Sequence, residues 1–309
     1  MKEIALYVHW PFCQSKCPYC DFNSHVRETI DQRQWQDALL AELDHAFEES
    51  GERELKSIFF GGGTPSLMSP DIVYGIIDKA LALWPSEKTP EITLEANPTS
   101  VERARFQGYR DAGVNRLSLG IQSLDPDVLK FLGRLHSVDQ ALHAIETARE
   151  IFDRYSFDLI YARPNQSIAE WQKELKDALE MAGDHLSLYQ LTIEPGTSFH
   201  TRFRLGEFEM PDENLAASFY EITQSIMIDA GLPAYEVSNH ARLGQESQHN
   251  LVYWRYQDYA GIGPGAHGRV YMRNGPQGAG KYATFRERLP EKWLQSVQQN
   301  GHATRENSL

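Results

Sequence analysis

Three cysteines lie close together near the start of the chain, at Cys13, Cys17 and Cys20, and the sequence holds no others. Three is an odd number, whereas a disulfide framework would spread an even number along the chain. Clustered thiols of this kind indicate a bound metal. Their C-x3-C-x2-C spacing allows one short loop to bind three irons of a [4Fe–4S] cube, which leaves the fourth iron open to another ligand.

Two other interpretations of these cysteines remain open. A zinc site could form from the three thiolates and one imidazole, either His9 or His25. Structural zinc sites usually combine C-x2-C pairs separated by a longer loop, whereas this chain has one compact triplet. The thiols could also be buried and inert. The spacing favours the cluster over both.

Further side chains capable of binding follow the predicted strands. They are Gly61, Gly62, Gly63 and Thr64 after the second strand, Glu95 at the end of the third, Gln122 and Ser123 after the fourth, Arg134, and Asp158 within the fifth. Because ligands of parallel α/β folds gather at the carboxyl ends of strands, we expect these residues to share a site. The glycines would let the backbone approach a ligand closely and offer it bare N–H groups.

Two carboxylates in this set suggest specific contacts. Glu95 could accept hydrogen bonds from ribose hydroxyls, and the alternative is a helix-capping or solvated side chain. Asp158 lies in an apolar strand and therefore needs a partner, which Arg134 or a ligand amine would supply. A purely structural ion pair between Asp158 and Arg134 is the alternative.

Alternating strands and helices must position these residues. Mostly continuous apolar runs predict strands at residues 4–9, 57–60, 91–95, 116–120, 156–160, 186–192 and 235–237. Two pairs, Ser69-Pro70 and Asp125-Pro126, predict helix starts, and so do capping boxes at Thr99/Glu102, Ser137/Gln140 and Ser167/Glu170. Asp212 predicts the start of a further helix that runs to about residue 229. We therefore predict an α/β fold with a parallel sheet, curved into a partial (β/α)6 TIM-like barrel. A doubly wound open sheet is the alternative.

The character of the sequence changes near residue 238. From there to residue 280 the chain is rich in glycine, aromatic residues and histidine, and a last helix is predicted at residues 291–299. We therefore predict two domains, residues 1–237 and an extension of residues 238–309.

Composition narrows the classes of function. Of the 309 residues 41% are hydrophobic, and the formal net charge is −13. That charge has the wrong sign for binding phosphate backbones, so nucleic acid is not an expected partner. No run approaches the roughly 20 apolar residues of a transmembrane helix, and the short apolar run at the start does not resemble a signal peptide. We expect a cytoplasmic protein.

The cysteine loop, with aromatic Tyr19 before its last cysteine, resembles that of the radical SAM superfamily. The resemblance implies a partial (β/α)6 barrel of the radical SAM type, in which S-adenosylmethionine (SAM) binds the open iron of the [4Fe–4S] cluster. An electron from the cluster would cleave SAM to a 5′-deoxyadenosyl radical, while the protein supplies orientation and shielding. It also implies that Gly62, Gly63 and Thr64 hold the SAM amino group.

Further motifs are similar to those of the oxygen-independent coproporphyrinogen III oxidase family. They include Tyr7-Val-His9-Trp-Pro-Phe-Cys13, Gly61-Gly-Gly-Thr-Pro-Ser, Leu94-Glu95-Ala-Asn-Pro, Gly120-Ile-Gln-Ser, Leu132-Gly-Arg and Gln190-Leu-Thr-Ile-Glu-Pro-Gly-Thr. This resemblance covers residues 4 to about 285. It implies a SAM site lined by Tyr7, Phe22, Gly62, Gly63, Thr64, Glu95, Gln122, Arg134 and Asp158.

Two departures from the family pattern argue against the oxidase activity. The oxidases carry a fourth cysteine two positions after the third, where this chain has Phe22, and an N-terminal extension where only six residues precede Tyr7. The chain resembles instead the heme-chaperone branch, which implies that it binds heme and passes it to an unidentified acceptor protein, such as a respiratory one, with an electron donor as a further partner. Decarboxylation of coproporphyrinogen III in porphyrin biosynthesis is the alternative, so enzymatic activity stays open. A zinc-stabilised scaffold is the third hypothesis.

The segment His249-Asn250-Leu-Val-Tyr253-Trp254 resembles the heme-binding segment of that branch. His249 offers an imidazole for axial ligation, and Tyr253 and Trp254 offer flat apolar surface for a porphyrin. His267, in a glycine-rich stretch downstream, is a weaker axial candidate. Because family members continue into a smaller C-terminal domain, we expect the extension of this chain to be truncated.

Overall fold

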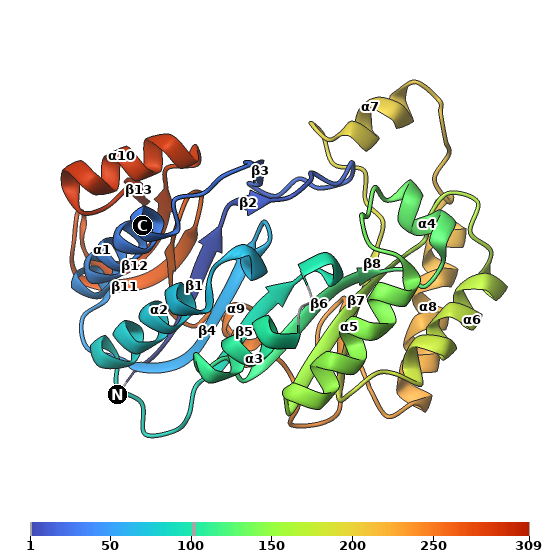
Figure 1. Ribbon diagram of the computed structural model, residues 1–309, viewed down its shortest axis with the longest axis horizontal. Coiled ribbons are helices and arrows are strands. Elements are labelled where there is room, and N and C mark those ends of the chain that lie inside the picture. The colour runs from blue at the N-terminus through green and yellow to red at the C-terminus, as the bar shows by residue number, and fades with distance from the viewer. Residues whose placement is uncertain (1, 101–102, 309) are drawn as a thin grey trace.

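Six consecutive parallel strands form the centre of the computed structural model, which describes residues 2–100 and 103–308 (Figure 1). They are β1 (Glu3–Trp10), β4 (Glu54–Gly62), β5 (Glu91–Ala96), β6 (Arg116–Gln122), β7 (Arg154–Tyr161) and β8 (His185–Gln190). Each is followed by helical segments before the next parallel strand begins. The prediction of a partial (β/α)6 barrel with a parallel sheet is confirmed.

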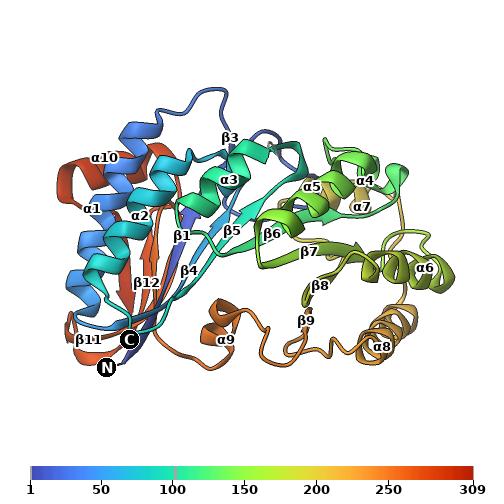
Figure 2. The same ribbon diagram turned by 60° about the horizontal axis from the view of Figure 1, so that its bottom comes forward.

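Helices cover the outer face of this sheet. They are α1 (Gln32–Ser50), α2 (Pro70–Leu83), α3 (Arg103–Asp111), α4 (Pro126–Phe131), α5 (Val138–Ile151), α6 (Ile168–Leu179) and α8 (Glu213–Asp229), with short 3-10 turns at Pro65–Leu67 and Pro98–Ser100. Helix α7 (Ser198–Arg204) lies instead against the loop of residues 13–20, where the Phe199 N–H donates to the Pro18 carbonyl over 2.8 Å. Figure 2 shows α1, α2, α3 and α5 on one face, whereas α9 (Gln248–Trp254) lies on the opposite, inner side of the curved sheet. The inner side is therefore partly filled by a segment from late in the chain.

The predicted helix starts follow from local capping chemistry. The side chains of Ser69, Asp125 and Asp212 accept backbone N–H bonds at the starts of α2, α4 and α8. Capping boxes form at Ser137/Gln140 and Ser167/Glu170. The predicted box at Thr99/Glu102 lies partly outside the described residues.

One predicted strand is wrong. Residues 235–237 form a bend, and the strand follows two residues later as β9 (Asn239–Ala241), antiparallel to β8. The Tyr235 N–H donates to the Asn239 carbonyl over 3.1 Å, and Ala234 pairs with His240. A tight reversal of the chain therefore occupies residues 235–237, where the sequence pattern predicts a strand.

Residues 238–308 join both edges of the same sheet. After β9 and α9, β10 (Tyr259–Ile262) pairs in parallel with β1, and β11 (His267–Gly275), β12 (Gly278–Arg286) and β13 (Thr304–Ser308) follow antiparallel. Helix α10 (Pro290–Asn300) contacts α1. The division of the chain at residue 237 stays a prediction, and the sheet runs across it.

A buried carboxylate fastens this C-terminal layer to α1. Glu42, which is fully buried, accepts the backbone N–H groups of Gly263 (2.7 Å) and Ala303 (3.0 Å) and the indole N–H of Trp293 (2.9 Å). Trp293 also stacks on Trp35 of α1, with ring centroids 5.2 Å apart. One side chain of α1 thus satisfies three donors from the last 50 residues of the chain.

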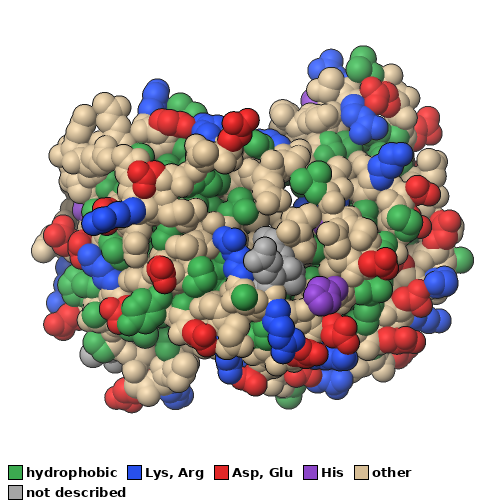
Figure 3. Space-filling model, in the orientation of Figure 1, with side chains coloured by type: hydrophobic (Ala, Val, Ile, Leu, Met, Phe, Trp, Pro, Cys, Tyr) green, Lys and Arg blue, Asp and Glu red, His purple; other side chains and the backbone are tan. Residues whose placement is uncertain are grey.

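The surface carries charges of both signs. On the face seen in Figure 3, acidic and basic side chains are interspersed and form no large area of one sign. Among the described helices, none has the length and apolar character needed to span a membrane.

Candidate functional site

The cysteine loop lies at the carboxyl ends of the parallel strands. It runs between two short strands, β2 (Phe12–Cys13) and β3 (His25–Val26), whose parallel pairing closes the loop at its base. Within the loop the Cys20 N–H donates to the Cys17 carbonyl over 3.1 Å. All three cysteines are half-buried and line one cavity of about 670 Å³. The loop therefore presents three thiols to a common space.

Each thiol has a polar neighbour. The Thr64 hydroxyl lies 3.5 Å from Cys13 Sγ, Arg134 Nη1 lies 3.3 Å from Cys17 Sγ, and the Ser24 hydroxyl lies 3.7 Å from Cys20 Sγ. Burial raises the pKa of the Cys13 and Cys20 thiols, and these hydroxyls oppose that rise. Donors placed at sulfur stabilise thiolates, so the donor set suits a cluster that takes one thiolate per iron.

Asn97, which the sequence analysis did not select, connects two of these neighbours. Its amide N–H donates to Thr64 Oγ1 over 3.0 Å, and its carbonyl oxygen accepts from Arg134 Nη2 over 2.6 Å. A hydrogen-bonded chain therefore runs from Cys13 through Thr64, Asn97 and Arg134 to Cys17. Two sequence signals could have found Asn97: its place directly after β5, two residues beyond Glu95, and its presence in the Leu94-Glu95-Ala-Asn-Pro motif.

The two histidines considered as zinc ligands already have partners. His9 places Nδ1 3.0 Å from the Tyr7 hydroxyl and Nε2 2.9 Å from the Asn23 carbonyl. His25 Nε2 lies 3.3 Å from the side-chain oxygen of Asn23. In residues 2–100 and 103–308, no group of three or more Cys, His, Asp or Glu side chains is arranged to hold a single metal ion.

The loop after β4 requires glycines for a different reason from the one predicted. A Cβ at Gly62 would lie 2.6 Å from the His9 ring, and one at Gly63 would lie 2.7 Å from the Phe12 carbonyl. Gly62 also has a φ of +113°, which favours glycine. The backbone N–H groups are not bare, because Gly63 donates to Trp10 and Thr64 to Phe12, at 2.7 and 2.8 Å. The glycines therefore allow this loop to pack against the end of β1.

Two carboxyl groups share the cavity next to the cysteines. Burial and then the negative charge of Asp158 raise the pKa of Glu95 to about 8, although the Gly62 N–H donates to it. Burial likewise raises the pKa of Asp158 to about 6, against the opposing effect of Arg134. Two carboxyls that repel each other in this way favour a cationic ligand, because a positive charge stabilises both ionised forms.

Asp158 is held by its neighbours in the sheet. The Ile121 N–H donates to Oδ1 over 3.0 Å and the Gln122 amide to Oδ2 over 2.7 Å. Gln122 adopts a φ of +73°, rare outside glycine, which places strain at this cavity-lining residue. Arg134 donates instead to Asn97, Gly120 and Cys17 and makes no ion pair with Asp158 within 4 Å. The structural ion pair between them is therefore not formed.

The residues expected to bind SAM fall into two neighbouring cavities. Eight of the nine line the first cavity: Phe22, Gly62, Gly63, Thr64, Glu95, Gln122, Arg134 and Asp158. The ninth, Tyr7, lines a second cavity of about 510 Å³, which Phe22, Gly62 and Glu95 also line. The cavities thus share a wall.

The segment expected to bind heme forms the inner helix α9. His249 is 1% exposed, with Nδ1 2.9 Å from the Ser57 hydroxyl and Nε2 2.7 Å from the Tyr253 hydroxyl. Asn250 donates to the Tyr235 hydroxyl over 3.1 Å. Tyr253 lines the second cavity, and Trp254 is exposed. In this arrangement both ring nitrogens of His249 are engaged within the protein.

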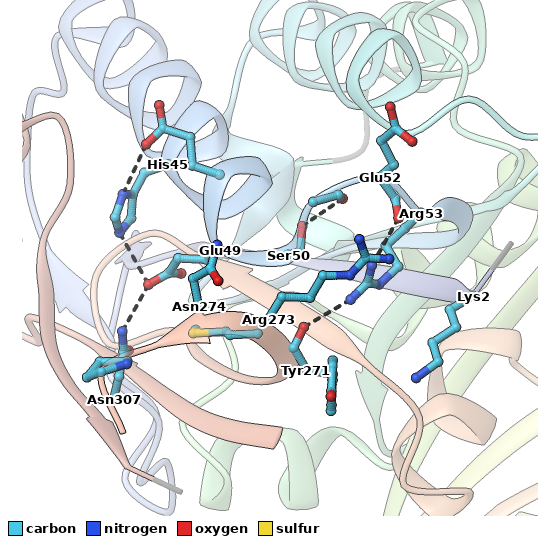
Figure 4. A pocket seen from close by; sticks show the side chains of 14 residues that line it. Lys2, His45, Glu49, Ser50, Glu52, Arg53, Tyr271, Arg273, Asn274 and Asn307 are labelled. Atoms are coloured by element: carbon cyan, nitrogen blue, oxygen red, sulfur yellow. Dashed lines mark hydrogen bonds and ion pairs between the residues drawn. The ribbon is translucent and has the colours of Figure 1, made fainter. Parts of the chain in front are cut away.

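A larger hollow of about 820 Å³ lies at the amino ends of β1 and β4, away from the cysteine loop (Figure 4). Several of its polar groups bind one another: Glu49 pairs with His45 at 3.2 Å and accepts from Asn307 at 3.1 Å, and Arg53 donates to the Tyr271 carbonyl at 2.9 Å. Because this hollow contains none of the residues selected from the sequence, the candidate site is the pair of cavities at the opposite ends of the strands.

Comparison with known proteins agrees with this geometry. The family model of the radical SAM superfamily matches residues 7–178. Heme chaperone HemW of Escherichia coli (strain K12) is 42% identical over 89% of this chain and 72% of its own length. The chain belongs to the HemW family of the radical SAM superfamily. HemW of Bacillus subtilis (strain 168) is 37% identical over 86% of the chain and 71% of its own length.

Animal proteins are also similar to this chain. Radical S-adenosyl methionine domain-containing protein 1 of Bos taurus, a mitochondrial protein, is 42% identical over 98% of the chain and 69% of its own length. The solved structure of coproporphyrinogen III oxidase HemN from Escherichia coli superposes with a TM-score of 0.81 over 99% of the chain and 72% of its own, at 23% identity, which shows the shared fold. Membership in the superfamily implies SAM and a [4Fe–4S] cluster as cofactors.

Proposed function

We propose that Cys13, Cys17 and Cys20 hold a [4Fe–4S] cluster and that SAM binds in the first cavity beside it. The hydrogen-bonded chain from Cys13 to Cys17 supports the cluster assignment, because it places a donor at each of these two sulfurs. A cluster held by these cysteines would supply the electron for cleavage of SAM.

The protein's own residues would bind and orient SAM. Glu95 and Asp158 supply negative charge and acceptors to the cationic and hydroxyl groups of the ligand, and Gln122 holds Asp158 in place. The proposed set comprises Tyr7, Phe22, Gly62, Gly63, Thr64, Glu95, Gln122, Arg134 and Asp158, and Asn97 joins it as the link between Thr64 and Arg134.

We propose further that the chain is a heme chaperone, which binds heme and passes it to an acceptor protein in a reducing compartment such as the cytoplasm, with an electron donor as a second partner. The observation that carries this proposal is the likeness to heme chaperones HemW over most of the chain. A second, aromatic-lined cavity beside the first offers room for a flat apolar cargo. Residues 249–254 contribute Tyr253 to its wall.

Anaerobic reconstitution followed by parallel assays tests the proposal. We expect about four irons and four sulfides per chain, and loss of both when the three cysteines are replaced by serine. Ferric heme added to the reconstituted protein should give a saturable Soret band. Zinc without sulfide would reject the cluster. Consumption of coproporphyrinogen III without saturable heme binding would replace the chaperone by the oxidase.

A further inference from the structure

One histidine beside the candidate site has a free ring. His267 opens β11, is exposed, and lines the second cavity. Among the described residues, neither of its ring nitrogens makes a hydrogen bond, and its one ring contact is with the edge of Phe285, 4.6 Å between centroids. An imidazole that is available at the wall of a cavity can serve as a metal ligand.

The two other histidines near this cavity are not available in the same way. Both ring nitrogens of His9 are bonded, to Tyr7 and to Asn23. Both ring nitrogens of His249 are bonded as well, to Ser57 and to Tyr253, and its ring is buried. To bind a metal, either ring would have to break the hydrogen bond at the ligating nitrogen, which costs about 1 kcal/mol or more.

The other residues around His267 offer the apolar contacts and the positive charge that heme binding requires. Phe22, Tyr253 and Tyr259 line the cavity with aromatic rings, and the first two are 64% and 39% exposed. Arg288 lines it too, and in the described part of the chain its guanidinium has no ion-pair or hydrogen-bond partner. The porphyrin ring of heme needs flat apolar contacts. Its iron needs an axial ligand, and its propionates need a cation.

We propose that heme binds in the second cavity with His267 as an axial ligand to its iron and with Arg288 at a propionate. This inference rests on the proposed heme-chaperone function and names the site within it. Partial enclosure of its ring by the cavity wall and the nearby Arg269 and Arg288 lower the pKa of His267, so its ring is neutral and able to bind iron at pH 7. His249 is then a positioning residue, because its bond to the Tyr253 hydroxyl fixes one wall.

Heme titration of the reconstituted protein tests the assignment, with the spectrum of the heme-free protein subtracted. In His267→Ala we expect a shifted Soret band and at least about tenfold weaker affinity, and added imidazole should restore the wild-type band. In Arg288→Gln the affinity should fall while the band stays in place. His143→Ala, which changes an exposed histidine on α5, is the matched control and should leave both unchanged.

The outcomes separate this inference from the function on which it rests. If the wild-type protein shows no saturable heme binding, the chaperone function fails and this site fails with it. If the wild type binds heme and His267→Ala keeps the same band and affinity, the function stands and the inference is overturned. A loss of the band in His249→Ala, with His267→Ala unchanged, would move the axial ligand to His249.

Discussion

Glu95 shows how one buried carboxyl group can make the stability of this protein depend on pH. Its folded pKa of about 8 lies above its ordinary value near 4.5, so the folded state prefers the protonated form. Without SAM, the free energy of unfolding should therefore fall as pH rises between about 5 and 8, by at most about 1.4 kcal/mol per pH unit. Glu95→Gln should reduce this slope, and Asp158, with a pKa of about 6, should preserve part of it.

Urea unfolding of both proteins at several pH values measures the slope. Glu194→Gln, which changes another acidic residue of the same cavity, serves as the control. Equal slopes for wild type and Glu95→Gln would contradict the raised pKa.

Asn97 is expected to control how firmly the cluster is held. Asn97→Leu would leave Thr64 and Arg134 without the amide that links them, so both would hold the cysteine sulfurs less well. Because outer-shell partners of metal ligands typically change affinity by about 10–100-fold, we expect the cluster to be lost to a chelator at least about tenfold faster. Loss of the visible cluster absorbance over time measures the rate.

Asn97→Asp provides the matched comparison, since it keeps the acceptor for Arg134 and loses the donor to Thr64. An intermediate rate is expected for this variant. If Asn97→Leu loses its cluster at the wild-type rate, the hydrogen-bonded chain has no part in holding it.

Residues such as Asn97 mark where prediction from sequence ends. The cysteine spacing, the glycine loop and the strand-end carboxylates were recognisable because each is a local pattern. Asn97 acts through contacts 33 and 37 residues away, and the Asn-Pro sequence around it indicates only a turn. His249 illustrates the reverse case, because the motif indicates a ligand but not the two hydrogen bonds that engage its ring.

At the scale of elements, the parallel strands were predictable and the C-terminal strands were not. Most residues of strands β4 to β8 are buried, so these strands stand out as apolar runs. Strand β12 contains two glycines, β13 reads Thr-Arg-Glu-Asn-Ser, and β9 has three residues, so none has a clear apolar period. β9 depends on long-range pairing with β8 at one edge of the sheet. At the other edge, β12 and β13 depend on long-range pairing and on Glu42, which a helix pattern cannot identify as an anchor.

Glu42 should therefore be among the most costly residues to replace in the C-terminal layer. Glu42→Leu leaves three buried donors without an acceptor, at about 1–3 kcal/mol each, so we expect a loss of at least about 3 kcal/mol of unfolding free energy. Glu42→Gln keeps one acceptor oxygen and should lose less. Urea denaturation checks both against Glu48→Gln, an exposed position on the same helix. A Glu42→Leu protein as stable as the wild type would show that Glu42 does not anchor this layer.

For the molecule as a whole, we expect the shared wall between the two cavities to couple their ligands. Phe22 lines both cavities and is 64% exposed, so its ring has little protein around it to fix its position. A ligand in the first cavity would pack against this ring and order one wall of the second. Two ligands that order the same wall bind with positive cooperativity, and the coupling must be equal in both directions.

We therefore expect SAM to tighten heme binding by about fivefold or more, and heme to tighten SAM binding by the same factor. Phe22→Ala should bring both factors toward one, because the shared ring is removed, whereas Phe203→Ala, an exposed phenylalanine on α7, should leave them unchanged. Heme titrations with and without SAM, and SAM titrations with and without heme, measure the two factors. Equal heme affinity with and without SAM in the wild-type protein would show that the cavities, although adjacent, act independently.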